Sequence, residues 1–592
     1  MPTDGGRVHI VLTNSSCAGT ITSATVNGQA APLPLSNAND DPDFKYFDWA
    51  RVHSDGGTVW FSFHSRNTGW LGGNGDSNQL SVTLGNPKTC WSGDVTVQGG
   101  RDVRVSYVTT RNNGAELVAH VHNYADKSTH NIAGLTVNGQ PVALELGAGA
   151  QANGALGPGD TLVVTHPLSP ALKPGDLWAV SLTADDAAAA ADDDSTNLRL
   201  APRRRALLAR RNRGRNGALT PQGWGGRVMP ERFPIQAWTH SSDCPYANVK
   251  GGNDKNAQEL LAAGIDSVLM DNSKCIGDDA SVLATAKSPT HVLAKSKYIK
   301  GNTDNVVGVF IGDEVDGKMD SNLRTTDPAQ ANKQWPQLPT YQGGKTNGHV
   351  GSYAGITDVQ GMDAYCAACA PTIVPVIHSL PPQYSYDYLK NARDNHAPLP
   401  TWMYSQLYSD AWSYQANSPE LVMQIGSVVV AGAKGVQLFQ SYHDQIQQHD
   451  WKSIASALKS ISTLREDLRQ GDIGGVRFST SASTGDGGEA LVEVIRSPDR
   501  VVVAVVSTHA TGYSNVLCHT FIDKHWTFHD LTVDKVSLTL PPGVKGLTNG
   551  VEVVNGSAGS LQDGAKIDGN EIKNIKFGNK VTVRFFRFDI QQ

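Results

Sequence analysis

The segment NVVGVFIGDEVD at 305–316 carries the strongest fold signal in the chain. An apolar run over 306–311 is followed by Gly312 and then by two adjacent acids, Asp313 and Glu314. A continuous apolar run of this length is typical of a strand that is buried on both faces, as in a parallel sheet covered by helices. Acids directly after such a strand indicate a polar pocket at its carboxyl end.

Similar apolar segments recur on both sides of this one, and helical patterns separate most of them. The other strand candidates are 233–240, 265–272, 290–299, 338–344, 358–365, 400–408 and 435–442. The helical patterns lie at 256–264, 278–288, 386–395, 419–434 and 450–468. This alternation predicts parallel βαβ units. Eight strands within about 240 residues predict a (β/α)8 barrel over 230–470.

The remaining sequence has short apolar stretches divided by Gly, Asn, Asp and Pro, which is typical of all-β domains. It predicts β-sandwich modules over 1–97 and 98–183, a low-complexity linker over 184–229 and a C-terminal β-sandwich over 471–592. The fold class expected is therefore a multidomain chain with an α/β barrel between N-terminal and C-terminal sandwiches.

Two segments, 21–35 and 132–146, each place Val-Asn-Gly-Gln between apolar stretches. Because Asn-Gly favours tight hairpins, this similarity indicates either two related modules or one hairpin turn that arose twice. The linker is rich in arginine, and we interpret it as a solvated hinge, with contact to an anionic polymer or a cleavage site as the alternatives.

Composition excludes several classes of protein. The 592 residues include 50 Lys and Arg against 56 Asp and Glu, with a net charge of −6, which argues against a general nucleic-acid binder. No apolar run approaches the length of a membrane span. Seven cysteines are too few for a disulfide scaffold. We expect an extracellular or secretory location for a mature chain, and a cytoplasmic location is the open alternative.

Chemistry in a parallel barrel takes place at the carboxyl ends of the strands, where Glu314 is our candidate general acid. Repulsion from Asp313 and partial desolvation would raise the pKa of one carboxyl group into the range that a general acid requires. The alternative interpretation is an ordinary loop carboxylate or a helix N-cap. As a second carboxylate at this edge, Asp363 is preferred over Asp271, which could simply form a turn.

The motif IGDEVD is similar to the Gly-Gly-Asp-Glu motif on the fourth strand of family 20 β-hexosaminidases, and the layout of barrel and β-modules resembles glycoside hydrolases more widely. The resemblance implies that Glu314 is the acid/base and that Asp313 orients the 2-acetamido group of the substrate. Only one glycine precedes the acids here, where that family has two.

Aromatic and polar residues near the predicted strand ends suit a carbohydrate, because sugar C–H faces stack on flat rings. The predicted substrate-binding residues are Trp238, His240, Asp271, Tyr341, Tyr365, Trp402, Gln406, Gln440, Tyr442 and His443. For each aromatic residue, a place in the hydrophobic core is the alternative.

Cys366 and Cys369 form one CxxC motif, which by itself favours a short disulfide or packed thiols over zinc. We therefore expect no metal and no cofactor. The sequence predicts a glycoside hydrolase that acts on a polysaccharide or glycan, with Glu314, Asp313 and Asp363 as catalytic residues. The alternatives are a substrate-assisted hexosaminidase and a non-catalytic carbohydrate-binding or surface protein.

Overall fold

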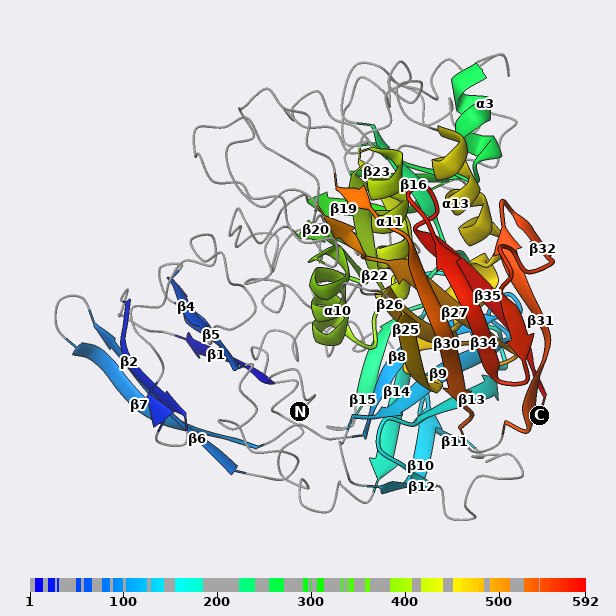
Figure 1. The fold of residues 1–592 in the computed structure, drawn as a ribbon. Helices are drawn as coiled ribbons and strands as arrows, with labels where there is room; N and C mark the ends of the chain where they lie inside the picture. Colours follow the sequence, from blue (N-terminus) through cyan, green and yellow to red (C-terminus); the bar gives the residue numbers. More distant parts are fainter. Residues whose placement is uncertain are drawn as a thin grey trace, which may run out of the picture.

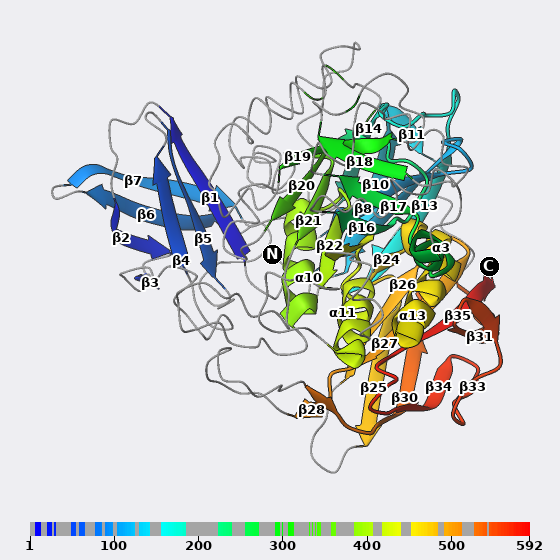
Figure 2. The same cartoon turned by 90° about the horizontal axis from the view of Figure 1, so that it is seen from above.

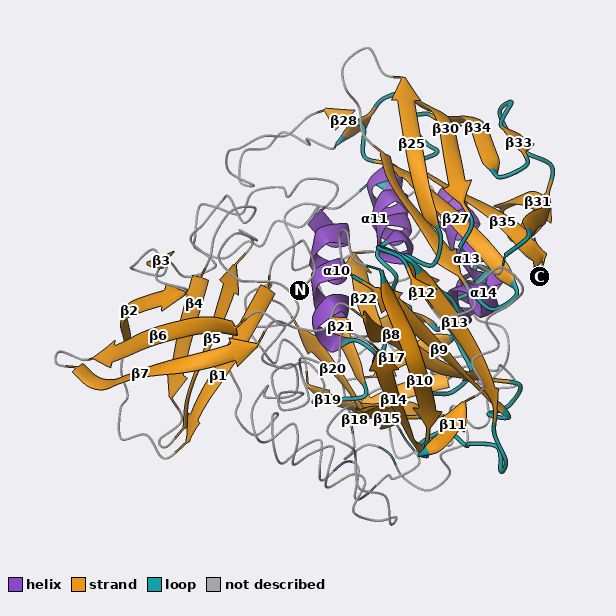
Figure 3. Cartoon of the chain, turned by 90° about the horizontal axis from the view of Figure 1, so that it is seen from below, coloured by secondary structure: helices purple, strands orange, loops and turns teal. Residues whose placement is uncertain are grey.

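The computed structural model describes the following parts of the chain: strands between residues 6 and 98; residues 103–124, 129–142, 155–184, 223–239, 255–270, 357–362, 384–406, 417–439, 451–483, 490–511, 526–541 and 544–591; strands 291–295, 306–312 and 340–344; and residues 299, 331, 334 and 338. Strands dominate these ranges (Figures 1 and 3). No helix among them is long and apolar enough to cross a membrane.

Eight parallel strands form a closed barrel in chain order, and β23 pairs back with β16. They are β16 Ile235–Thr239, β17 Ser267–Met270, β18 His291–Lys295, β19 Val306–Gly312, β20 Thr340–Gly344, β21 Val359–Met362, β22 Thr401–Gln406 and β23 Val436–Phe439. Each lies within one of the eight strand segments predicted from the sequence. Because all eight are parallel, their carboxyl ends meet at one edge of the barrel.

Helices cover part of the barrel surface, and four of them follow strands in the order that a (β/α)8 unit requires. These are α3 Lys255–Ala262 after β16, α10 Tyr384–His396 after β21, α11 Ser418–Val430 after β22 and α13 Trp451–Thr463 after β23. The predicted helix over 278–288 lies outside the described residues. A complete (β/α)8 barrel is therefore part of the proposal below.

The N-terminal strands form two antiparallel sheets, which lie to one side of the other strands in Figure 2. One has the order β1-β5-β4, from β1 Gly6–Thr13, β4 Trp49–Ser54 and β5 Thr58–Ser65. The other has the order β3-β2-β6-β7, from β2 Thr20–Val26, β3 Gln29–Ala30, β6 Ser77–Gly85 and β7 Thr89–Gln98.

In both Val-Asn-Gly-Gln segments the Val and the Gln pair across an antiparallel ladder. Val26 pairs with Gln29 in the first, and Val137 pairs with Gln140 in the second. The second turn has positive φ at both Asn138 and Gly139, as a type I′ turn requires. The first strand of each segment also has a register shift at the equivalent place, between residues 21 and 23 where β2 pairs with β6, and between 132 and 134 where β10 pairs with β14. The similarity therefore extends beyond the turn, although the relation between whole modules stays a prediction.

The next sandwich places sheet β13-β9-β8 against a sheet built on β11-β10-β14-β15. Its strands are β8 Val103–Arg111, β9 Glu116–Asn123, β10 His130–Val137, β11 Gln140–Val142, β12 Ala155–Leu156, β13 Thr161–Pro167, β14 Leu177–Ala184 and β15 Gly223–Arg227. Apolar side chains from both sheets share one core around Val105, Val121 and Trp178.

Strand β15 corrects the linker predicted over 184–229, because the end of that range is the edge strand of the sheet. Its sequence, Gly-Trp-Gly-Gly-Arg, has no apolar alternation and so gives no strand signal. A Cβ atom at Gly226 would lie 2.5 Å from Leu399 and 2.9 Å from Trp178. The glycine that hides the strand in the sequence is therefore what allows its backbone to approach these side chains.

The C-terminal sandwich pairs a six-stranded sheet, β24-β26-β27-β35-β31-β32, with a four-stranded sheet, β25-β30-β34-β33. The strands are β24 Asp472–Ile473, β25 Arg477–Ser483, β26 Ala490–Arg496, β27 Arg500–Ser507, β30 Leu531–Thr539, β31 Gly546–Val554, β32 Ser557–Gly559, β33 Lys566–Asp568, β34 Glu571–Phe577 and β35 Val583–Gln591. A small separate pair joins β28 Ala510–Thr511 to β29 Thr527–Phe528.

Strand β27 is buried on both faces, which explains its unbroken apolar run. Val502, Ala504 and Val506 belong to the core shared with the barrel helices. The alternate residues Val501, Val503 and Val505 belong to the core between the two C-terminal sheets. Because successive side chains of a strand point to opposite faces, this strand holds the barrel and the outer sheet together.

Helix α11 is the barrel element that packs on this sheet. Asn417 caps it, with its side chain accepting from Glu420 N at 3.0 Å while Glu420 accepts from Asn417 N at 2.7 Å. Glu420 also accepts a bond from the backbone N–H of Trp526 at 2.7 Å. The cap therefore fixes both the start of the helix and its contact with the C-terminal region.

Gly426 provides a test of this packing. A Cβ atom there would lie 2.8 Å from Val583 and 2.9 Å from Val506. We expect Gly426→Ala to lower the free energy of unfolding by about 1–3 kcal/mol, because the clash exceeds the gain in helix propensity. Urea unfolding measures this. Gly134→Ala is the matched control, since nothing lies within 4 Å of its Cβ, and equal stability of the two variants would contradict the packing.

Candidate functional site

The candidate site is the edge of the barrel where the eight strands end. β19 ends at Gly312 and β21 ends at Met362, so Asp313 and Glu314 follow the first and Asp363 follows the second. These three residues lie outside the described residues. The same holds for six predicted binding residues: His240, Asp271, Tyr365, Gln440, Tyr442 and His443. Gln406 is the last residue of β22, and only its backbone is described.

Three predicted binding residues, Trp238, Tyr341 and Trp402, lie in the barrel interior with exposed fractions of 2–4%. Trp238 packs against Phe310, Tyr404 and Phe439, with ring centroids 5.8, 5.0 and 5.3 Å apart. The rings of Tyr341 and Trp402 lie 4.5 Å apart. These residues thus fill the barrel as core, as the alternative interpretation has it, and a direct role in substrate binding stays a prediction.

Burial raises the pKa of Tyr341 well above its ordinary value, and the nearby Asp358 adds to this effect. The phenol is therefore neutral across the physiological range, and its hydroxyl donates to the carbonyl of Val307 at 3.4 Å. A neutral, hydrogen-bonded tyrosine in the barrel interior is suited to a structural role below the candidate site at the strand ends.

A buried polar cluster among the described residues lies elsewhere, and the sequence patterns do not predict it. It consists of Ser106, Tyr107, His120, Arg393, Lys434 and Asp472, which we call the Asp472 cluster. Lys434 lies two residues before β23 begins, so the cluster is near the amino ends of the barrel strands. The residues come from β8, β9, α10, the segment before β23 and β24, and nothing in the sequence marks them as neighbours.

Asp472 is the centre of the cluster, with a side chain that is 1% exposed. Its two oxygens accept bonds from Arg393 at 3.1 Å, and Ser106 Oγ donates to it at 2.8 Å. Lys434 Nζ lies 3.9 Å away, donates to the carbonyls of Leu468 and Gly471, and stands 4.2 Å from the centre of the Tyr107 ring. The single carboxylate of Asp472 therefore balances the positive charges of two buried side chains, Arg393 and Lys434.

Opposing effects set the ionisation of these groups. Burial alone would raise the pKa of Asp472, but Arg393 and Lys434 hold it well below its ordinary range. Burial lowers the pKa of Lys434 to about 8, against the attraction of Asp472. Both groups are therefore charged near neutral pH.

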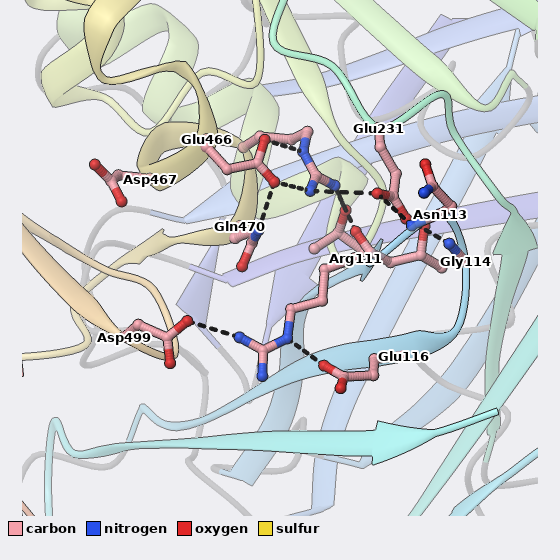
Figure 4. A network of polar contacts seen from close by, with 12 residues as sticks. Arg111, Asn113, Gly114, Glu116, Glu231, Glu466, Asp467, Gln470 and Asp499 are labelled. Carbon is pink, nitrogen blue, oxygen red and sulfur yellow. Dashed lines mark hydrogen bonds and ion pairs between the residues drawn. The ribbon is translucent and has the colours of Figure 1, made fainter.

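A second polar network joins the 103–184 sandwich to the segment before β16 and to the C-terminal sandwich (Figure 4). Glu231, just before β16, accepts from the backbone N–H groups of Asn113 at 3.0 Å and Gly114 at 2.6 Å. Arg111 donates to Asp499 at 2.8 Å and also pairs with Glu116. The bonds to Glu231 hold the turn between β8 and β9 against the segment before β16.

We interpret both networks as structural. Their polar groups bond mainly to one another, and they lie near the end of the barrel where such residues ordinarily provide stability. Within the described residues, no group of three or more His, Cys, Asp or Glu side chains is arranged to hold a metal ion. Cys366 and Cys369 lie outside these residues.

Comparisons with known proteins give no family. No protein-family model matches the chain, and no curated protein matches it. Solved structures align with it at low similarity. The family 2 β-galacturonidase of Eisenbergiella tayi is 11% identical with a TM-score of 0.24, over 75% of this chain and 81% of that one. A β-glucuronidase of Bacteroides uniformis is 10% identical with a TM-score of 0.26, over 100% and 90%.

A third structure, the FMN-binding β-glucuronidase of Facaelibacterium prausnitzii L2-6, is 10% identical with a TM-score of 0.27, over 90% of this chain and 86% of that one. At such TM-scores these alignments carry no argument about the fold or the activity of this chain.

The Asp472 cluster yields a test of its structural role. Asp472→Asn removes the counter-charge of Arg393 and Lys434, and we expect a loss of about 3–5 kcal/mol in the free energy of unfolding. The control is Asp499→Asn, whose side chain is 65% exposed and whose loss should stay under about 1 kcal/mol. Urea unfolding followed by tryptophan fluorescence measures both. Similar losses in the two variants would contradict the assignment.

Proposed function

We propose that this chain is a glycoside hydrolase that cleaves a polysaccharide or glycan at the carboxyl edge of a (β/α)8 barrel. The observation that carries the proposal is the ending of β19 at Gly312, immediately before Asp313 and Glu314, in a closed parallel barrel. Acids at such a position stand where barrel enzymes carry their chemistry.

The barrel register supports Asp363 as the second carboxylate. Gly312 pairs with Gln342, and Gln342 pairs with Gln360. Along the sequence, Glu314 follows this level by two residues and Asp363 by three. One strand lies between β19 and β21, and a strand spacing of about 4.8 Å puts their backbones about 10 Å apart. This strand separation is compatible with the roughly 5 to 10 Å between the two carboxyl groups of glycosidases.

The filled interior of the barrel supports a site on the edge rather than inside. Trp238, Phe310, Tyr404 and Phe439 pack together below the strand ends. We therefore expect a substrate to lie above these four aromatic side chains, among the residues that follow the strands. In this proposal Glu314 donates a proton to the leaving oxygen, while Asp363 acts as nucleophile or as the base for water, or Asp313 takes the second role.

The domain organisation proposed from the sequence fits this function. The modules over 1–97, 98–183 and 471–592 would brace the barrel or extend its contacts with a glycan. A polymeric substrate also favours the extracellular or secretory location. No metal or cofactor is needed for the proposed chemistry.

The test is the release of reducing sugar from a panel of polysaccharides. We expect wild type to cleave at least one of them and Glu314→Gln to lose at least about 100-fold in kcat, because removal of a general acid has this magnitude. Glu259→Gln on α3 is the matched control and should retain activity. Absence of cleavage on a broad panel, or equal activity of Glu314→Gln, would overturn the proposal.

Two alternatives give different results in that experiment. The IGDEVD motif favours a substrate-assisted hexosaminidase, for which Asp313 would orient the acetamido group. It predicts cleavage restricted to 2-acetamido sugars and inhibition by a thiazoline mimic of the cyclised intermediate. The comparisons add no support for this family. A non-catalytic carbohydrate-binding protein would retain glycan affinity in Glu314→Gln and release no sugar from any substrate.

A further inference from the structure

Two histidines of β9, His120 and His122, face the segment 470–474 that leads from the barrel into the C-terminal sandwich. His120 Nε2 lies 2.7 Å from the carbonyl oxygen of Gln470. His122 lies over Gly474, where a Cβ atom would meet its ring at 3.2 Å. We call this contact between β8, β9 and β13 on one side and residues 470–474 on the other the sandwich joint.

Hydrogen bonds fix the neutral tautomer of each ring. The carbonyl of Gln470 can only accept, so His120 Nε2 carries the proton and Nδ1 carries the lone pair. Thr161 donates its single hydroxyl proton to the carbonyl of Gly474 at 2.9 Å. Its oxygen must therefore accept from His122 Nδ1, at 2.7 Å, and Nε2 of His122 carries the lone pair. Protonation of either ring would therefore add a second N–H, on the nitrogen that carries the lone pair in the closed joint.

The surroundings of both rings already hold an excess of positive charge. The charged groups that act on the two rings are the cations Arg104, Lys390, Arg393, Lys434 and Arg496, from β8, α10, the segment before β23 and β26, and the carboxylate Asp472 of β24. Glu493 of β26, whose carboxylate is attracted by Lys390 and Arg393, adds a second carboxylate. Asp160, beside Thr161, pairs instead with Arg477 at 3.1 Å. Five cations thus face two carboxylates before either histidine is protonated.

We propose that the sandwich joint is an acid-sensitive latch, which opens when His120 and His122 take up protons. In the closed joint a second ring proton would be buried among these cations. In the open joint water solvates each imidazolium and the repulsion falls. The 103–184 sandwich would then loosen from residues 470–474 while each sandwich keeps its own core.

The direction of the pH effect follows from the pKa values. Burial lowers the pKa of each histidine from 6.5 to about 4 in the closed joint; Arg393 adds to this effect at His122, whereas Asp472 opposes it at both rings. Above pH 6.5 neither state binds the extra protons, so pH has no effect. As pH falls from 6.5 toward 4, only the open state binds them, and opening becomes more favourable. At pH 4.5 this linkage amounts to about 70-fold in the opening equilibrium for each histidine.

Amides whose hydrogen bonds cross between the sandwich and the barrel report on opening. Val108 N donates to the carbonyl of Pro398 at 3.4 Å, and Gly114 N donates to Glu231. Hydrogen exchange of the full chain, expressed as protection factors corrected for intrinsic rates, should show a reversible loss over 106–115 between pH 7.5 and 4.5. We expect this loss to exceed that of β27 and β35 by at least tenfold.

The key variant is His120→Gln with His122→Asn, because these amides place an N–H where Nε2 and Nδ1 donate but take up no proton. It should abolish the excess loss over 106–115, whereas His166→Gln on β13 should leave it unchanged. If the double variant does not fold, His122→Asn alone must reduce the loss. A uniform loss across all sheets in wild type, or an unchanged loss in the histidine variants, would overturn the proposal.

Discussion

The ion cluster around Asp472 is the interaction on which the arrangement of the described residues depends. This carboxylate lies at the start of β24, yet it bonds to Arg393 of α10 and to Ser106 of β8. A buried charge is costly unless its partners are held in place, so each of the three regions restricts the other two. The apolar contact of α11 with β27 stabilises the association of the barrel with the C-terminal sandwich. The directional bonds of the Asp472 cluster determine how these regions are positioned relative to one another.

This arrangement gives the two ends of the barrel different tasks. Near the amino ends of the strands, charged side chains are paired and buried, and they connect the barrel to both sandwiches. At the carboxyl ends, strands β19 and β21 lead directly into the acids Asp313 and Asp363. Between the two ends, the aromatic residues around Trp238 fill the interior. We propose chemistry only at the carboxyl edge.

Sequence patterns predicted the strands of the barrel because several of them, such as β19, are short apolar runs and helical patterns separate most of them. They predicted α10, α11 and α13 because these helices carry apolar faces. They missed β15, where glycines remove the alternation that marks a strand. They also missed the Asp472 cluster, because isolated Asp, Arg and Lys residues resemble surface residues until the fold buries them. The sequence predicts Trp238, Tyr341 and Trp402 near the strand ends. It does not show which face of the strand each side chain takes, and in the structure all three point into the barrel interior. The roles of Glu314 and Asp363 remain a prediction from the sequence and the register.

The most direct test of this account is a double-mutant cycle between Arg393→Gln and Asp472→Asn, measured as the free energy of unfolding of the full chain. If the pair links the barrel to the C-terminal region, the two losses will not add. The account predicts a coupling energy of at least about 1.5 kcal/mol, within the range for contacting charged groups. A coupling energy near zero would contradict it, because the pair would then contribute nothing to holding these regions together.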